Sequence, residues 1–451
     1  MFLILAGYLG YIQVIKGEEL FFHPQNPRLA RLESERMRGV ITDRQGKILA
    51  RTVKEKEGLR REYPLGEAAA QVIGYASNRF GSSGLEAAYA GELLGIKGWA
   101  RFKNLAAQLA GRQPRGADLS LTLDADLQDL AYRLLAGRRG AIVALDPRTG
   151  AVLALASSPS FNPNNLAGEM ARIAARPGGS PLLNRAIQGV YPPGSTLKPV
   201  TAAAALGANT AVAGGKFVCP GFLEVNGRRL HCPHPHGTVD FSQAMMYSCN
   251  VTFAKMALEV GGENFVRTAE SFGFNQEIPL ELPVLPGRLP PSSKLNANEL
   301  AEIAIGQGEV TTTPLHMALI AAAIANDGLM MRPFIVESVK AFNGRVIWQV
   351  KPRVWRVTTG AEVAKIIRRA MEAVVARGTG QAAELPGVRV AGKTGSAQNP
   401  QGKAHAWFIG FAPVEAPRAA VAVIIENGGA GGEVAAPLAR EVLAKAIGVV
   451  D

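Results

Sequence analysis

Two sets of apolar segments, one near residue 140 and one near residue 420, constrain the fold of this 451-residue chain more than any other feature. Residues 140–157 form two apolar runs joined by a Pro/Gly turn, a pattern typical of a β-hairpin. A long, mostly helical middle follows, and then three further strand candidates and a closing helix. These four segments are residues 387–398, 404–413, 418–429 and 434–447. Strands at both ends of a helical middle predict one antiparallel sheet with helices packed on it, an α+β fold.

The rest of the chain divides by composition. Residues 1–15 carry no charge but are fewer than the roughly twenty apolar residues of a spanning helix, so we interpret residues 1–17 as the tail end of a membrane anchor that begins upstream. Residues 18–117 are charged and irregular, which predicts an extended α+β pedestal domain. From residue 118 the apolar residues recur at regular spacing, and Asp124 is the expected N-cap of a helix with one apolar face. A compact domain is therefore expected over residues 118–451.

The net charge of +12 favours an anionic neighbourhood, which could be nucleic acid, an acidic membrane face or an anionic polymer. The sequence contains no glycine-rich phosphate loop, no standard zinc-finger spacing and no aromatic-plus-basic run of the kind that reads RNA. We therefore expect no nucleic-acid partner and no cofactor, and we attribute the basic character to a cell-wall or membrane environment.

Ser195 and Lys198 form the first pair that suggests chemistry. In a helix that begins at Ser195, positions i and i+3 share a face, so the lysine amine would lie beside the serine hydroxyl. Gly194 permits a tight turn into that helix, and the alanine-rich sequence that follows indicates burial. A buried amine has a lowered pKa and can take a proton from serine, which makes the hydroxyl a usable nucleophile. The pair alone fits equally well an N-cap serine followed by a solvated lysine.

Two later motifs favour the catalytic interpretation. Ser248 and Asn250 form an S-x-N motif, and Lys393, Thr394 and Gly395 form a K-T-G motif. Each is weak by itself, because Ser160 also begins an S-x-N by chance. Three motifs in this order, each at the expected boundary of a helix or strand, are a strong signal of a serine acyl-transfer site.

The chain resembles the class B, monofunctional penicillin-binding proteins. The three motifs carry the resemblance, and residues 38–50 and 81–95 are similar to the N-terminal pedestal of that family. Residues 140–157, 305–318 and 406–413 are similar to segments of its transpeptidase domain. The resemblance implies a membrane-anchored D,D-transpeptidase on the extracytoplasmic side that cross-links peptidoglycan stem peptides ending in D-Ala-D-Ala and is acylated by β-lactams. A D,D-carboxypeptidase with the same residues, or a non-enzymatic β-lactam receptor or wall-assembly scaffold, are the alternatives.

The resemblance also implies a role for each motif residue. Ser195 would attack the carbonyl of the penultimate D-alanine, and Lys198 would be the base. Ser248 would relay a proton to the departing D-alanine, while Asn250 would orient Lys198 and hydrogen-bond the substrate amide. A separate membrane glycan polymerase would be the partner of the enzyme.

The third motif would bind the substrate. The backbone amides of Ser195 and Ser396 would form an oxyanion hole. Thr394 and the Ser396 hydroxyl would hold the terminal carboxylate, in the field of Lys393. Gly395 would leave room beside the strand.

The cysteines and histidines between the first two motifs raise the question of a metal. Cys219, Cys232, His234 and His236 have the composition of a zinc site, but their spacing matches no standard finger. We therefore expect no metal, and either a Cys219–Cys232 disulfide or two free thiols. Cys249 is interpreted as a small buried residue beside the active site.

Overall fold

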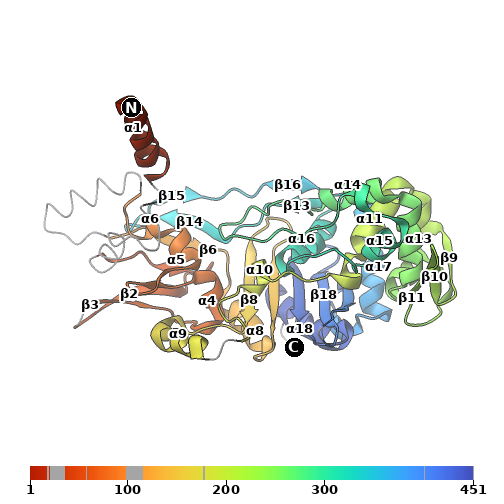
Figure 1. Cartoon of the computed structure of the whole chain (residues 1–451). Coiled ribbons are helices and arrows are strands. Elements are labelled where there is room, and N and C mark those ends of the chain that lie inside the picture. The colour runs from red at the N-terminus through yellow and green to blue at the C-terminus, as the bar shows by residue number, and fades with distance from the viewer. Residues whose placement is uncertain are drawn as a thin grey trace. The chain divides into compact units, whose positions relative to one another are not determined.

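The computed structural model describes residues 1–17, 20, 36–56, 58–97, 115–175, 178–400 and 402–449. The chain forms two compact units, each assembled from separate segments (Figure 1). The first unit contains Met1–Ala125, Ser160–Pro177 and Val336–Val350, and the second contains Asp126–Pro159, Gly178–Ile335 and Lys351–Asp451. Of the expected pedestal, residues 18, 19, 21–35, 57 and 98–114 lie outside the described residues. The expected domain boundary at residue 118 stays a prediction.

The first unit is built around a six-stranded sheet. Its strand order is β15-β14-β6-β1-β2-β3, with β1 and β6 parallel and the other neighbours antiparallel. These strands are β1 (Ile41–Thr42), β2 (Ile48–Glu55), β3 (Gly58–Glu62), β6 (Asp118–Leu121), β14 (Val336–Lys340) and β15 (Val346–Gln349). The other elements are α4 (Glu67–Ile73), β4 (Ala76–Ser77), β5 (Gly81–Ser82), α5 (Gly84–Ala88), α6 (Ala90–Leu93), η2 (Pro163–Asn165) and α9 (Leu166–Ala175).

A buried ion cluster lies within this unit. Both oxygens of the Glu86 carboxylate are paired, at 2.9 Å with Arg38 Nε and at 2.7 Å with Arg61 Nε. All three side chains are at least 95% buried. Because two guanidinium groups pair with one buried carboxylate, removing Glu86 would take away the charge that both arginines share, which is strongly destabilising.

The N-terminal segment of the first unit is apolar and exposed. It consists of α1 (Phe2–Gly10) followed by a π-helical turn, η1 (Tyr11–Ile15). No side chain of α1 is buried, although Phe2, Leu3 and Ile4 are all apolar. Among the helices of the described residues, none has both the length and the apolar character needed to cross a membrane.

The second unit has the predicted antiparallel sheet as its centre. Its strand order is β17-β18-β19-β7-β8, and every neighbouring pair is antiparallel. The strands are β7 (Gly140–Leu145), β8 (Val152–Ser158), β17 (Ala391–Ala397), β18 (His405–Ala412) and β19 (Ala419–Ile425). The predicted hairpin, the three later strands and the α+β class are therefore confirmed.

Helices cover both faces of this sheet. One face packs with α8 (Ala125–Leu135) and α18 (Gly431–Ile447) in a core that includes alternate β19 residues such as Val421 and Val423. Since side chains alternate along a strand, the other β19 residues face the opposite side. There, α16 (Pro314–Ala325), whose every residue is buried, packs against β7, β18 and β19. Coverage of both faces explains why β7, β8 and β19 read as continuous apolar runs.

The remaining elements of the second unit are helices, 3-10 turns and short strands. The helices are α10 (Arg185–Gln188), α11 (Lys198–Ala208), α12 (Phe241–Met246), α13 (Asn250–Val260), α14 (Gly262–Ser271), α15 (Ala297–Ala304) and α17 (Ala361–Arg377). The 3-10 turns are η3 (Gly194–Leu197), η4 (Thr210–Gly214), η5 (Ser292–Lys294) and η6 (Gln381–Ala383). The short strands are β9 (Lys216–Cys219), β10 (Phe222–Val225), β11 (Arg228–His231), β12 (Gly237–Asp240), β13 (Leu329–Met331) and β16 (Val354–Val357).

Candidate active site

Ser195 lies in a 3-10 turn rather than at the start of an α-helix. The turn η3 spans Gly194–Leu197, and α11 begins only at Lys198. The local sequence explains this difference: Pro199 has no N–H to donate to the Ser195 carbonyl, which instead accepts from the Lys198 N–H. Side chains at i and i+3 eclipse in a 3-10 turn, so Ser195 and Lys198 still project from the same side. Gly194, the first residue of this turn, has a φ of +55°, which glycine adopts without strain.

Lys198 lies at the floor of the site, fully buried. Its ammonium donates to the Ser248 carbonyl oxygen at 2.6 Å, to Ser248 Oγ at 3.1 Å and to Asn250 Oδ1 at 2.8 Å. Burial, partly opposed by the nearby thiols of Cys232 and Cys249, lowers the pKa of Lys198 to about 7. A substantial fraction of this amine is therefore neutral, and able to accept a proton, near neutral pH.

Ser248 and Asn250 stand at the start of α13. Ser248 adopts a left-handed backbone conformation with a φ of +59°, which is uncommon for a residue other than glycine. Its hydroxyl receives hydrogen bonds from both lysines, at 3.1 Å from Lys198 and at 2.9 Å from Lys393. The Asn250 side chain accepts from Lys198 and donates to the His231 carbonyl oxygen at 2.8 Å. The second motif thus connects the two lysines to the end of β11.

The third motif lies on β17, the edge strand of the five-stranded sheet. Lys393 is fully buried and also donates to the Thr394 carbonyl oxygen at 2.9 Å. Burial, followed by repulsion from Lys198, lowers the pKa of Lys393 well below its ordinary value. An edge strand has backbone N–H and C=O groups without a strand partner on one side, so an extended peptide can bind alongside β17.

A cavity of about 1060 Å³ opens beside the three motifs. The motif residues that line it are Ser195, Ser248, Asn250, Thr394, Gly395 and Ser396. Lys198 and Lys393 lie beneath its surface, where they reach the cavity through Ser248. Among the described residues, no hydrogen bond joins the Ser195 hydroxyl to Lys198. Catalytic hydrogen bonds commonly tighten only when substrate is bound.

Two glycines allow the close packing behind Ser195. Gly194 donates its N–H to the Gly306 carbonyl oxygen at 2.8 Å, and a Cβ on Gly306 would lie 1.9 Å from the Gly194 carbonyl oxygen. A Cβ on Gly395 would lie 3.0 Å from the Thr196 methyl group. Gly395 is therefore small because β17 packs directly against the turn that carries Ser195.

The sequence analysis missed three residues at this site. Thr379 Oγ1 lies 2.6 Å from Thr394 Oγ1, and the Gly431 N–H donates to Ser396 Oγ at 3.2 Å. Trp407, which is fully buried, donates from Nε1 to the Pro192 carbonyl oxygen at 3.1 Å and so supports the turn before Ser195. Trp407 lies in residues 406–413, which carry part of the family resemblance, but its role could not be read from that likeness. Thr379 and Gly431 belong to none of the three motifs, so no local pattern indicated them.

The cysteines do not form the disulfide considered above. Cys219 and Cys232 are free thiols with their Sγ atoms 3.6 Å apart, and Cys249 is a third buried thiol beside them. His236 joins this group, whereas His234 is exposed.

Two family descriptions match the chain. Residues 140–444 match the penicillin binding protein transpeptidase domain, and residues 38–119 match the penicillin binding protein A dimerisation domain. Together these matches extend over both structural units.

Curated proteins and solved structures agree with these matches. The peptidoglycan D,D-transpeptidase PbpA of Mycolicibacterium smegmatis is 35% identical, over 99% of this chain and 96% of that protein. The peptidoglycan D,D-transpeptidase MrdA of Acinetobacter baumannii is 34% identical, over 86% of this chain and 66% of that protein. A penicillin G acyl-enzyme complex of penicillin-binding protein A from Mycobacterium tuberculosis is 34% identical and has a TM-score of 0.85, over 91% of this chain and 100% of that one. A D,D-transpeptidase domain from Eggerthella lenta is 37% identical with a TM-score of 0.84, over 92% of this chain and 99% of that one.

Proposed function

The chain belongs to the class B penicillin-binding proteins, and from that premise we propose which residues carry out the reaction of this family. It is a peptidoglycan D,D-transpeptidase, a serine-type enzyme that cross-links stem peptides through an acyl-enzyme and is acylated by β-lactams. The assignments below concern the individual residues of this chain.

In the acylation step, Ser195 Oγ attacks the carbonyl carbon of the penultimate D-alanine, and its proton passes to the neutral amine of Lys198. The backbone amides of Ser195 and Ser396 stabilise the oxyanion that forms. The bond to the terminal D-alanine nitrogen then breaks, and Ser248 relays a proton to that nitrogen. The amine of an acceptor stem peptide next attacks the acyl-enzyme, so the cross-link forms and Ser195 regains its proton.

The other motif residues position these groups and the substrate. Asn250 holds the Lys198 amine, as its 2.8 Å hydrogen bond supports. Thr394 and the Ser396 hydroxyl bind the terminal carboxylate, and Lys393 contributes positive charge when protonated. Gly395 keeps β17 close to the turn that carries Ser195.

One observation supports these roles most strongly. Ser248 Oγ lies within hydrogen-bonding distance of two fully buried lysines, at 3.1 and 2.9 Å, on the wall of the cavity that also exposes Ser195. Two buried amines that share one hydroxyl repel each other and favour loss of a proton. Burying two amines side by side lowers the stability of the fold. Groups with pKa values perturbed in this way are concentrated at functional sites, so we expect this pair at a site of proton transfer.

Acylation and acceptor transfer test the proposal separately. The purified protein is incubated with a fluorescent penicillin, and in parallel with a D-Ala-D-Ala thioester analogue plus a D-amino-acid acceptor. We expect labelling and acceptor transfer, both lost in Ser195→Ala and both retained in Ser293→Ala, which changes an exposed serine outside the site. Hydrolysis without transfer would favour a D,D-carboxypeptidase, and labelling without any turnover would favour a receptor or scaffold.

We further propose that residues 1–17 belong to a membrane anchor, residues 18–117 to a pedestal and residues 118–451 to the transpeptidase domain, on the extracytoplasmic side. The exposed apolar side chains of α1 support the anchor. A membrane glycan polymerase is the expected partner, because cross-linking requires new glycan strands. Membrane fractionation and protease accessibility in intact spheroplasts test the location, and co-purification with a polymerase tests the partner.

A further inference from the structure

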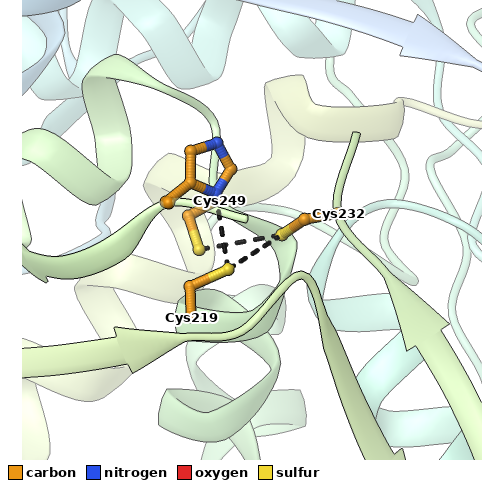
Figure 2. Close-up of side chains that lie close together, drawn as sticks. Cys219, Cys232 and Cys249 are labelled. Carbon is orange, nitrogen blue, oxygen red and sulfur yellow. Dashed lines mark hydrogen bonds between the residues drawn. The ribbon is translucent and has the colours of Figure 1, made fainter. Parts of the chain in front are cut away.

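Three thiols and an imidazole from residues 219 to 249 lie close together in the second unit. Cys219 ends β9, Cys232 follows β11, and Cys249 is the N-cap of α13. His236 lies immediately before β12, which pairs with β9 so that Gly237 is opposite Cys219. The ligand atoms of all four residues lie within 4.8 Å of one another. Figure 2 shows the sulfur atoms of the three cysteines pointing toward a common centre.

Three of the six separations between the ligand atoms are close to the edges of a metal-centred tetrahedron. With a Zn–S bond of about 2.3 Å and a Zn–N bond of about 2.05 Å, tetrahedral geometry requires S···S edges of about 3.8 Å and S···N edges of about 3.6 Å. The Sγ atoms of Cys219 and Cys232 are 3.6 Å apart, and those of Cys232 and Cys249 are 3.8 Å apart. Cys219 Sγ lies 3.4 Å from His236 Nδ1. A disulfide, in contrast, requires about 2.05 Å between its sulfur atoms.

The surroundings of the sulfur atoms suit thiolates. Cys232 Sγ accepts from the backbone N–H groups of Asn250 at 3.0 Å and Val251 at 3.3 Å. Cys249 Sγ accepts from the backbone N–H of Thr252 at 3.4 Å and from its hydroxyl at 3.2 Å. These donors, together with the positive end of the α13 dipole, stabilise negative charge on the sulfur atoms. Such hydrogen bonds to ligating atoms are the usual second layer of a metal site.

The imidazole is held in place from outside the cluster. The ring of His236 stacks on Tyr247, with ring centroids 5.9 Å apart and an angle of 10° between the planes. Its backbone N–H donates to the Cys219 carbonyl oxygen at 3.2 Å. His236 is half-buried and the three cysteines are buried, so most of the cluster is shielded from solvent.

We propose that Cys219, Cys232, Cys249 and His236 bind one zinc ion in a closed, structural Cys₃His site. Three soft thiolates and one imidazole in a tetrahedral arrangement select zinc among the common divalent cations. Four protein ligands leave no open coordination position, so the ion has no part in the acyl-transfer chemistry. The inference replaces the sequence-based expectation of no metal, which considered His234 and His236 but omitted Cys249 as a ligand.

The site connects directly to the active-site motif. Cys249 lies between Ser248 and Asn250, and Cys232 accepts the Asn250 N–H. His231, which precedes Cys232, accepts from the Asn250 side chain and lines the cavity. Zinc would therefore fix the start of α13 and one cavity wall relative to each other, and its loss should disturb the position of Asn250 beside Lys198.

The test measures metal content first. Untagged protein, purified without chelator, is assayed for zinc by mass spectrometry and for release of zinc when a mercurial reagent titrates the thiols. We expect about one zinc ion per chain, released as the thiols react. Cys219→Ser and His236→Ala should lose it, whereas His234→Ala, the matched control, should retain it. Protein reconstituted with Co²⁺ should show the d–d absorption of a tetrahedral site and a thiolate charge-transfer band, both absent from His236→Ala.

Stability and acylation provide further readouts. A strong chelator should lower the melting temperature of wild type and of His234→Ala, and should reduce fluorescent penicillin labelling in both. Ser195→Ala should keep its full zinc content although it cannot be acylated, so failure of this proposal and failure of the proposed catalytic roles are distinguishable. If Cys219→Ser does not fold, His236→Ala still tests the site with all three thiols in place. Absence of zinc after reconstitution, a Cys219–Cys232 disulfide, or equal zinc in wild type and His236→Ala would overturn the proposal.

Discussion

Replacing Lys198 by arginine keeps a positive charge at the floor of the cavity but removes the group that can give up its proton. With a pKa of about 7, roughly half of the Lys198 amine is neutral at pH 7. An arginine with a pKa above about 12 has a neutral fraction below about one in 10⁵ at the same pH. This fall in the fraction of neutral base is larger than the rate acceleration that a general base provides, which is commonly about 10² to 10⁴. The whole of that acceleration should therefore be lost in the arginine variant. We expect acylation to slow by about 10² to 10⁴.

The assay is the rate of covalent labelling by fluorescent penicillin over a series of pH values. In wild type the rate should rise with pH through about 7, because the neutral amine is the active form. Lys198→Arg should be labelled slowly, and its labelling rate should not rise with pH through about 7. Lys365→Arg changes an exposed lysine on α17 and should match wild type. Since a guanidinium can overfill the buried site, Lys198→Met, which is close in length and carries no charge, provides a second variant without a base.

A stability measurement checks the same pKa independently. The folded-state pKa of about 7 lies below the ordinary value of 10.5, so the unfolded chain binds more protons between these values. The contribution of Lys198 to stability should therefore rise as pH increases from about 7 toward 10.5, and Lys198→Met should lose this part of the pH dependence. An arginine variant that acylates within about tenfold of wild type, a loss of only about 1.4 kcal/mol in transition-state stabilisation, would refute Lys198 as the base.

Ser195→Ala should abolish covalent penicillin labelling and shift the melting temperature by a few degrees at most, because the lost hydroxyl contributes about 1 kcal/mol to folding. Label that persists on another residue, located by peptide mapping, would contradict this. Gly306 has a φ of +76° and no room for a Cβ, so Gly306→Ala should lower unfolding free energy by more than about 2 kcal/mol in denaturant titration. Gly178→Ala, at an exposed position where no atom lies within 4 Å of the new Cβ, should change it by less than about 0.5 kcal/mol, and equal losses would show that the Gly306 turn is not constrained. Burial lowers the pKa of His316 to about 4, so the unfolded chain binds more protons than the folded chain between pH 6.5 and about 4, and stability should fall as pH drops through this range. His316→Asn should flatten that part of the profile, and an unchanged slope would exclude His316 as its source.

Local sequence patterns predicted much of the second unit. Apolar runs and turn residues located β7, β8 and the three later strands, because strand formation and burial depend on neighbouring side chains. The order of the three motifs indicated the acyl-transfer site before any distance was known. The 3-10 turn at Ser195 was missed, although its cause, the absent N–H of Pro199, is itself local.

Other features depend on residues that are far apart in the chain. Residues 160–177 and 336–350 join the first unit, although each interrupts sequence that belongs to the second. Thr379 contacts Thr394 because α17 packs against β17. No periodic pattern in the sequence indicates a contact of this kind. Cys249 was interpreted as a small buried residue and not as a ligand. The spacing patterns that identify zinc sites from sequence compare ligands that are close together in the chain.

The sequence by itself therefore determined the strands of the five-stranded sheet, their place along the chain and the residue types able to do the chemistry, because each depends on side chains only a few positions apart. Tertiary structure decided which of these groups meet and what that contact does to them. Lys198 and Lys393 are 195 positions apart, and sheet and helix packing brings both to Ser248 Oγ. The lowered pKa values of both lysines and the convergence of three thiols with His236 follow from burial and proximity, which exist only once the chain has packed.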